Sequence, residues 1–451
     1  MSACTGVTSH RGRSSSPGEE RRHAVAIGGA YEWFVGIDWA TQAHQVSVLN
    51  GHGHQVAERS VTHAGGAIGE FVDWLGQVTG GEPERVAVAI EIPRGAVVET
   101  LVERGCHVYA VNPKQLDRFR DRYTVAGAKD DRRDAFVLGA ALRTDPGAFR
   151  RIRLDDPVVI ELREYSRMDE ELREELARLA NRLREQLHRF FPQMLALVPA
   201  ADEPWLWALL EAVPSPPAGG RVRRAQIAKV LRAHRIRRVD ADAVRAALAT
   251  APLPVAPGTA EAARAHVALL VPRLRLAHEQ RLRCGRQIDA LLTRLGDPGP
   301  SSGPPGPPSD VRILRSLVGV GTRVAATMFA EAAQLLGDRD YHALRAHAGI
   351  APVTRQSGKR QQVVMRYACN RRLREAIYHW ARVSVQHDAR SAGLYAGARR
   401  RGHTHGRALR GVGDRLLRIL VAMLKSRTVY DPQFVRQPVA DVLPLAAEIA
   451  P

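Results

Sequence analysis

The chain has 451 residues, and its 66 Lys and Arg residues against 47 Asp and Glu residues give a formal net charge of +19. This excess of positive charge favours a nucleic-acid partner through phosphate neutralisation, and it argues much less for a membrane. The sequence has no apolar stretch long enough to span a bilayer and no secretory signal, and aromatic residues make up only 5%, which argues against base stacking as the main binding mode. The four cysteines show neither metal-ligand spacing nor a paired framework, so we expect a reducing, cytoplasmic setting.

Two apolar runs in the first third of the chain each end in an acid. Residues 1–30 are rich in Ser, Gly and Arg and are predicted to be a disordered tail. Residues 33–37 and 86–90 are then predicted to be buried strands, followed directly by Asp38 and Glu91. Because desolvating an unpaired charge is costly, buried strands rarely carry ionised carboxylates, and these two acids are therefore candidates for a functional site.

The segments around these two runs predict one α/β unit over residues 31–150. The further elements expected are strands at 45–49, 55–62 and 106–111 and helices at 68–75 and 94–104, the last with Pro93 suited to its first turn. The order βββαβαβα, with acids on the first and fourth strands, is that of the ribonuclease-H-like fold, in which those two strands lie side by side. This order alone indicates a nuclease, resolvase, transposase or sugar kinase.

Two more acids open the helical stretch that follows. Asp131 and Asp134 are three residues apart, so on a helix they share one face, and in a ribonuclease-H-like fold this last helix brings them to Asp38 and Glu91. Carboxylates gathered in this way repel one another unless a cation joins them, and hard oxygen ligands favour Mg²⁺ or Mn²⁺. The alternative is a pair of strand-end caps and a solvated charge run.

The middle of the chain, residues 151–296, is predicted to be helical. Apolar residues recur at spacings of three and four over 158–190, as in a long amphipathic or coiled-coil helix, although Asp169 interrupts the seam. A Pro/Ala/Arg-rich insertion at about 214–261 is expected to form short helices. A second long helix at about 262–295 is expected to fold back on the first as an antiparallel hairpin. Residues 297–310 form a Gly/Pro-rich linker.

The third region, residues 311–433, carries glycines, a serine and clustered cations. Residues 314–326 resemble a helix-hairpin-helix in which Gly319 and Gly321 allow a tight turn and exposed amides can hold a phosphate; a plain helical turn is the alternative. Ser357 lies among cations that include Lys359 and Arg360, a setting that favours an exposed hydroxyl beside a phosphate, although a turn serine fits too. Further candidate phosphate contacts are Arg371, Arg372 and Arg374, which could instead pair with Glu375 and its neighbours on a helix surface. Residues 434–451 are expected to be a tail.

These motifs together resemble a known family. Gly36-Ile37-Asp38, Ile90-Glu91 and residues 129–135 look like the N-terminal DEDD domain of the IS110 family of insertion-sequence transposases. The motifs that resemble that family's C-terminal domain are residues 319–321, 349–352, 356–360, 370–374 and 430–432. The family pattern selects Asp131 as the acid before Asp134, with Asp130 as the fallback.

The resemblance implies a RuvC-like DNA recombinase in a prokaryotic cytoplasm, associated with the nucleoid when bound to DNA. Asp38, Glu91, Asp131 and Asp134 would then hold Mg²⁺ or Mn²⁺, and Ser357 would be the nucleophile. The implied partners are donor and target DNA, a guide RNA called the bridge RNA, and further copies of the chain in a dimer or tetramer with a composite site. Two alternatives stay open: a RuvC-like junction resolvase that uses metal-activated water, and a non-catalytic nucleic-acid-binding protein.

Overall fold

The computed structural model describes residues 31–122, 130–256, 258–296, 306–358 and 360–433. Its contacts divide the chain into two compact units, residues 1–154 and 155–451. Several predictions lie outside the described residues: the tails at 1–30 and 434–451, linker residues 297–305, and the side chains of Lys129 and Lys359. Within the described ranges, no helix combines the length and the apolar character needed to cross a membrane.

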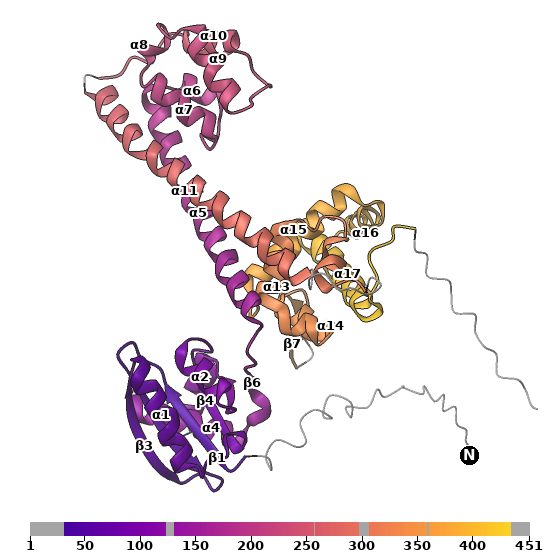
Figure 1. The fold of residues 1–451 in the computed structure, drawn as a ribbon. Helices are drawn as coiled ribbons and strands as arrows, with labels where there is room; N and C mark the ends of the chain where they lie inside the picture. Colours follow the sequence, from indigo (N-terminus) through magenta and orange to yellow (C-terminus); the bar gives the residue numbers. More distant parts are fainter. Residues whose placement is uncertain (1–30, 123–129, 257, 297–305, 359, 434–451) are drawn as a thin grey trace, which may run out of the picture. The chain divides into compact units, whose positions relative to one another are not determined.

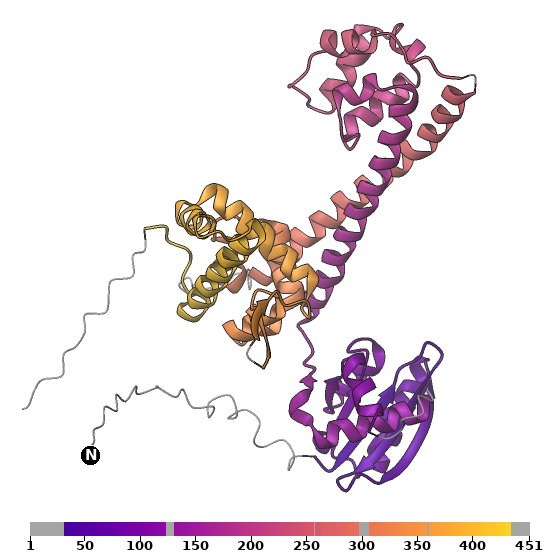
Figure 2. The ribbon, with the colours of Figure 1, turned by 180° about the vertical axis from the view of Figure 1, so that it is seen from behind.

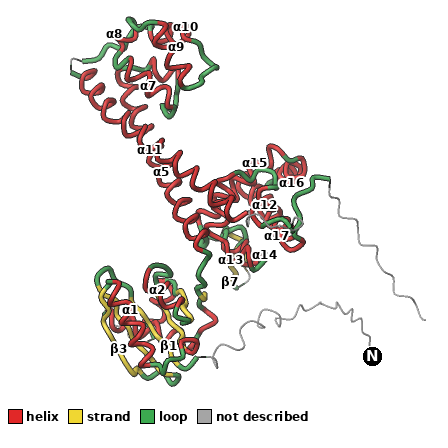
Figure 3. Tube along the Cα trace, in the orientation of Figure 1, coloured by secondary structure: helices red, strands yellow, loops and turns green. Residues whose placement is uncertain are grey.

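The first unit is a mixed sheet of six strands with helices on both faces (Figure 1, Figure 3). Its strands are β1 (Trp33–Asp38), β2 (Ala43–Asn50), β3 (Gln55–Thr62), β4 (Val86–Ile90), β5 (His107–Ala110) and β6 (Arg150–Arg151). They lie in the order β3-β2-β1-β4-β5-β6, with β1 parallel to β4 and antiparallel to β2. The predicted adjacency of the first and fourth strands is confirmed.

The helices of this unit bury the two faces of the sheet unequally. They are α1 (Gly65–Val78), η1 (Pro83–Arg85), α2 (Ala96–Glu103), α3 (Pro113–Arg120), α4 (Asp131–Thr144) and η2 (Pro146–Ala148). Large apolar side chains of β1, β2 and β4 pack with α1 and α2 on one face. The other face packs with α3 and α4, and there β4 contributes only Ala87 and Ala89. A mixed α/β unit is thus confirmed, with α4 on the face where β4 carries only small residues.

One helix start was predicted too early. The helix expected over 94–104 is α2, which begins at Ala96, because Gly95 before it has φ +94 and cannot belong to the helix. Pro93 therefore lies in the preceding loop and not in the first helical turn.

The second unit is mainly helical and is organised by two long helices, α5 (Pro157–Phe190) and α11 (Thr259–Gly296). They run side by side in opposite directions, as both views show (Figure 1, Figure 2). Asp169, which interrupts the apolar seam of α5, is only 7% exposed. Its carboxylate pairs with Arg281 of α11 at 3.1 Å and with Arg323 at 3.3 Å, so this break in the seam is a buried ionic junction.

Each end of the long helices joins a separate core. One end packs with α6 (Gln193–Leu197), α7 (Pro204–Ala212), α8 (Pro216–Gly219), α9 (Arg224–Ala233) and α10 (Ala241–Leu248), so the Pro/Ala-rich insertion does form short helices. The other end packs with α12 (Asp310–Arg315), α13 (Thr322–Gly337), α14 (Tyr341–His347), α15 (Arg371–His387), α16 (Ala389–Arg400) and α17 (His405–Ser426). Between α14 and α15 lies a two-stranded hairpin of β7 (Val353–Ser357) and β8 (Arg360–Val364).

Candidate functional site

Asp38 and Glu91 lie at neighbouring positions at one end of the sheet. β1 and β4 are parallel with Ile37 opposite Ile90, so the next residue of each strand is the acid. Side chains alternate between the two faces of a strand, and Phe34 packs on the α4 face, so Asp38 belongs to that face as well. Both carboxylates are half-buried.

Two glycines let α4 lie directly on the backbone of β1. A Cβ added at Gly36 would be 1.8 Å from the carbonyl oxygen of Ala135 and 2.5 Å from the nitrogen of Gly139. A Cβ at Gly139 would in turn be 3.1 Å from the nitrogen of Gly36 and 3.3 Å from the carbonyl oxygen of Phe34. The helix therefore runs opposite to β1, and its first turn lies at the Asp38 end of that strand.

The three acids at the start of α4 have different surroundings. Asp130 is the N-cap residue, and its carboxylate accepts a hydrogen bond from the Arg132 amide at 3.2 Å. Asp131 is exposed, whereas Asp134 is only 1% exposed. The fold thus buries Asp134 beside the strand ends and leaves Asp131 exposed to solvent. Asp130 caps the N-terminus of α4.

A cation that the sequence did not reveal holds Asp134. Arg120, the last residue of α3, donates from Nε and Nη2 to the two oxygens of Asp134, each at 2.6 Å. Its Nη1 donates to Asp117 at 2.7 Å. The hydrogen bond to Asp134 raises the pKa of Arg120 against the effect of burial, and the charges of Asp117 and Glu91 add to the rise. Arg120 is therefore the internal countercharge of this end of the sheet.

The acids have the chemistry of a magnesium site but not its assembled geometry. Carboxylate oxygens are the hard ligands that Mg²⁺ and Mn²⁺ prefer. Across the part of the chain that the structure describes, however, no group of three or more His, Cys, Asp or Glu side chains is arranged to hold a metal ion. Arg120 donates to both oxygens of Asp134, so the side-on position of that carboxylate is already occupied.

A pair of histidines, of which only His44 is buried, lies beside the loop that follows Asp38, and it too was missed. His44 is 1% exposed, its Nδ1 accepts from the Ala40 amide at 3.3 Å, and its Nε2 lies 2.9 Å from Nδ1 of His63. Burial, and then the neighbouring His63, lower the pKa of His44. Because Nδ1 accepts, the neutral His44 donates from Nε2, and the pair ties β2 and β3 to the loop after Asp38.

Ser357 lies at the tip of the β7–β8 hairpin. It is opposite Arg360 in the register, next to Gly358, which has φ +55 as a tight turn requires. Ser357 and Arg360 are exposed, and the hairpin also exposes Val363 by 62% and the following Tyr367 by 74%. An isolated two-stranded hairpin has little stability of its own in water.

The predicted phosphate-binding arginines at the start of α15 differ in their contacts. Arg371 is 85% exposed and pairs with Glu375 at 3.2 Å, as the structural alternative expected. Arg372 pairs with Glu170 of α5 at 3.1 Å, and Nε of Arg374 is buried without a hydrogen-bond partner among the described residues. Exposed pairs such as Arg371–Glu375 contribute at most about 1 kcal/mol, so this ion pair does not prevent Arg371 from meeting a phosphate.

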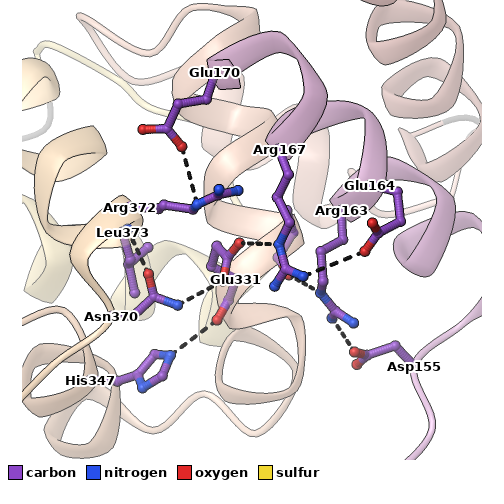
Figure 4. A network of polar contacts seen from close by, with 11 residues as sticks. Asp155, Arg163, Glu164, Arg167, Glu170, Glu331, His347, Asn370, Arg372 and Leu373 are labelled. Atoms are coloured by element: carbon purple, nitrogen blue, oxygen red, sulfur yellow. Dashed lines mark hydrogen bonds and ion pairs between the residues drawn. The ribbon is translucent and has the colours of Figure 1, made fainter. Parts of the chain in front are cut away.

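A buried polar network fixes the start of α15 (Figure 4). Helix α13 is kinked at Ala332 (φ −142), and Glu331 beside the kink accepts from Asn370 at 2.7 Å and from Arg167 of α5 at 3.3 Å. His347 donates to the carbonyl oxygen of Glu331 at 3.2 Å. Burial would raise the pKa of Glu331, but Asn370 and Arg167 lower it. Since Asn370 is also the N-cap of α15, the network positions the first turn of that helix, which carries the arginines. His347 has a structural role in this network.

The glycines predicted to bind phosphate lie between α12 and α13. Gly319 has φ +87, and a Cβ there would be 2.9 Å from the Ser384 hydroxyl and 3.1 Å from the Trp380 carbonyl oxygen. Gly319 is therefore needed for the turn and for close packing on α15. Gly321 is exposed and precedes the first turn of α13, so its position remains compatible with the phosphate-binding prediction.

Comparisons with known proteins match both of these regions. Residues 35–192 match the transposase family model for the DEDD domain of IS110 elements, and residues 311–396 match the model described as "Transposase IS116/IS110/IS902 family". The first match contains the four acids, and the second contains Ser357 and the arginines of α15.

Relatives with names of the same kind are found in Sinorhizobium fredii and Streptomyces coelicolor. A Sinorhizobium fredii protein named as a transposase, y4uE, is 52% identical over 209 residues, which are 46% of this chain and 58% of that protein. A Streptomyces coelicolor protein named as the mini-circle transposase for IS117 is 28% identical over 412 residues, or 89% of this chain and 95% of that protein. The insertion element IS110 protein of the same organism is 29% identical over 88% of this chain and 95% of its own length. The chain therefore belongs to the IS110 family of insertion-sequence transposases.

Proposed function

We propose that this protein is the recombinase of an insertion sequence, which cleaves and rejoins DNA strands under the direction of a structured guide RNA. The observation that supports the proposal is that β1, β4 and α4 bring Asp38, Glu91 and Asp134 to the same end of the sheet. These acids come from three segments far apart in the sequence. Carboxylates brought to one place can hold divalent cations, which assist phosphodiester cleavage, whereas structural capping does not call for such a grouping.

The acids would form the metal-binding half of the active site in a ribonuclease-H-like, RuvC-like unit. Asp38, Glu91 and Asp134 would hold Mg²⁺ or Mn²⁺, and Asp131, exposed on the same helical turn, would complete the set. A divalent cation bound there supplies positive charge that stabilises the scissile phosphate. The half-burial of Asp38 and Glu91 excludes part of the solvent and strengthens their electrostatic effect.

Ser357 would be the nucleophile. Its Oγ would form a bond to phosphorus while the bond from phosphorus to the departing DNA oxygen breaks, which leaves a phosphoserine-linked strand. A serine hydroxyl needs a base or a strongly polarising setting. Since His347 is bound to the Glu331 carbonyl, we assign proton removal to the carboxylates of the acid set. Lys359 and Arg360 would stabilise the charge that develops on the phosphate.

Sequence choice would rest with a guide RNA, the bridge RNA, that pairs with donor and target DNA. The net charge of +19 suits a partner with many phosphates, and Arg371, Arg372, Arg374 and Gly321 would contact backbone rather than bases. The exposed apolar side chains of the Ser357 hairpin support its docking onto another subunit, so we propose a dimer or tetramer with acids and serine from different copies.

Trapping of a covalent intermediate tests this function. The full chain, its guide RNA and labelled donor DNA are incubated with Mg²⁺, denatured, and analysed for protein-linked DNA, and the linkage site is mapped by mass spectrometry. We expect a metal-dependent adduct on Ser357. Metal-dependent cleavage without an adduct would favour the resolvase that uses activated water. Nucleic-acid binding without cleavage would favour a non-catalytic protein.

A further inference from the structure

Arg120 binds Asp134, one of the carboxylates that the proposed function assigns to the metal ion. Its guanidinium binds both oxygens of Asp134 at 2.6 Å, in the side-on geometry that a carboxylate offers only once. The Asp134 side chain is 2% exposed, and that of Arg120 is 25% exposed. The guanidinium therefore occupies the side-on position of Asp134, and burial of the carboxylate shields its remaining lone pairs, so a metal ion can take the side-on position only after Arg120 leaves.

The pair neutralises the buried charge of Asp134 in the metal-free protein. A carboxylate buried without a countercharge carries a large desolvation cost, and the guanidinium that pairs with Asp134 is also attracted by the charge of Glu91. Arg120 removes this cost. A divalent cation would remove it equally well, so the guanidinium and the metal ion are alternative partners for the same oxygens.

Arg120 has a second acceptor to which it can withdraw. Asp117 lies one turn earlier on α3, accepts from Nη1 of Arg120 at 2.7 Å, and is 66% exposed. When the guanidinium leaves Asp134, it therefore keeps Asp117 as an ionic partner on its own helix and needs no additional anion.

We propose that Arg120 is a displaceable internal cation that keeps Asp134 closed to metal, and that a divalent ion gains this ligand only when Arg120 swings away toward Asp117. Arg120 is thus a positioning residue for the acid set. The inference rests on the proposed function, since it assumes that Asp134 becomes a metal ligand.

The first test measures Mn²⁺ binding to the full chain by titration calorimetry. Arg120→Gln removes the competing charge, so it should tighten Mn²⁺ binding about tenfold or more, while lowering the melting temperature of the metal-free protein. Arg122→Gln is the matched control, because Arg122 is 54% exposed and meets only Asp145 at 4.0 Å among the ion pairs described. That control should bind Mn²⁺ like the wild type. Equal or weaker binding by Arg120→Gln would overturn the inference.

The second test needs no variant. Arg120 of the wild-type protein is labelled with phenylglyoxal with and without Mn²⁺, and the modified peptide is quantified against Arg122. We expect labelling of Arg120 to rise several-fold on Mn²⁺ binding while Arg122 stays constant. Constant labelling of Arg120 in a protein that binds Mn²⁺ would overturn the displacement alone. If the wild type binds no Mn²⁺, or if Asp38→Asn binds Mn²⁺ as the wild type does, the metal site is overturned, and the displacement of Arg120 with it.

Discussion

The acid set at the end of the N-terminal sheet and the Ser357 hairpin of the second unit are built in contrasting ways. Asp38 and Glu91 follow strands whose side chains are buried, and α4 lies against them through the contact of Gly36 with Ala135. The β7–β8 hairpin is exposed along nearly its whole length, and its serine lies at the turn. Packing within the unit fixes the first group of residues.

This difference suggests a division of labour. Packing positions the carboxylates before any ligand arrives, which is how a site is preorganised. The hairpin has no such support of its own, while the network around Glu331 holds the α15 start that follows it. We infer that the backbone positions of the acids are fixed in the free protein, although Arg120 still holds Asp134, and that the serine becomes ordered for reaction only in the assembled complex.

The largest expected effect comes from replacing Ser357, compared with another exposed residue of the same hairpin. Ser357→Ala should lose strand exchange and the protein–DNA adduct by at least about a hundredfold, and retain RNA and DNA binding, because only the nucleophile is removed. Thr354→Ala, an equally exposed change on the same strand, should leave all of these intact. Recombination assays and gel shifts measure both. A recombining Ser357→Ala protein would reduce Ser357 to a turn residue.

A second prediction concerns the packing that distinguishes the acid set. Gly36→Ala should destabilise the first unit by about 3 kcal/mol or more, because its Cβ meets backbone atoms that cannot move aside. Gly69→Ala on α1 meets nothing within 4 Å and should instead stabilise by roughly 0.5–1 kcal/mol through helix propensity. Denaturant unfolding measures both changes. A mild effect of Gly36→Ala would mean that α4 is not held close to β1.

A third prediction sharpens the role of the second unit as a phosphate-binding surface. Arg371→Gln should weaken binding to all DNA and RNA sequences alike and reduce the slope of affinity against salt by about one. Arg104→Gln, which removes a charge on the α1–α2 side of the other unit, should leave the slope unchanged. Affinities at several salt concentrations provide the measurement. A changed target preference with an unchanged slope would contradict a phosphate contact.

The smallest effect is a pH dependence near the acid set. The pKa of His44 is below its ordinary value of 6.5, so the unfolded chain binds a proton that the folded protein rejects. The contribution of neutral His44 is therefore complete above pH 6.5 and is lost as the pH falls below it. His44→Gln should flatten the decline of unfolding free energy between pH 7 and 5, and His52→Gln in an exposed turn should not.

The sequence allowed Asp38 and Glu91 to be placed together because each acid directly follows an apolar strand and parallel neighbours end at one edge. The i, i+3 spacing placed Asp131 and Asp134 on one helical turn, but it did not predict that Asp134 is buried and Asp131 exposed. Arg120 was not predictable, because its partner lies 14 residues away in the sequence and no periodic pattern links them. The Glu331 network was missed for the same reason, since its members come from α5, α13, α14 and α15. Local sequence patterns predict helices and strands, whereas ion pairs between distant residues depend on tertiary packing.

The most direct test of the account asks whether the acid set and Ser357 serve one reaction. Adduct formation is measured in Asp38→Asn, which retains Ser357, with Asp73→Asn on the exposed surface of α1 as the control. Loss of one carboxylate relieves repulsion, so the metal-free stability of Asp38→Asn should not fall. The account predicts a folded protein that binds RNA and DNA yet forms no adduct on Ser357. An adduct at the wild-type level in Asp38→Asn would contradict it.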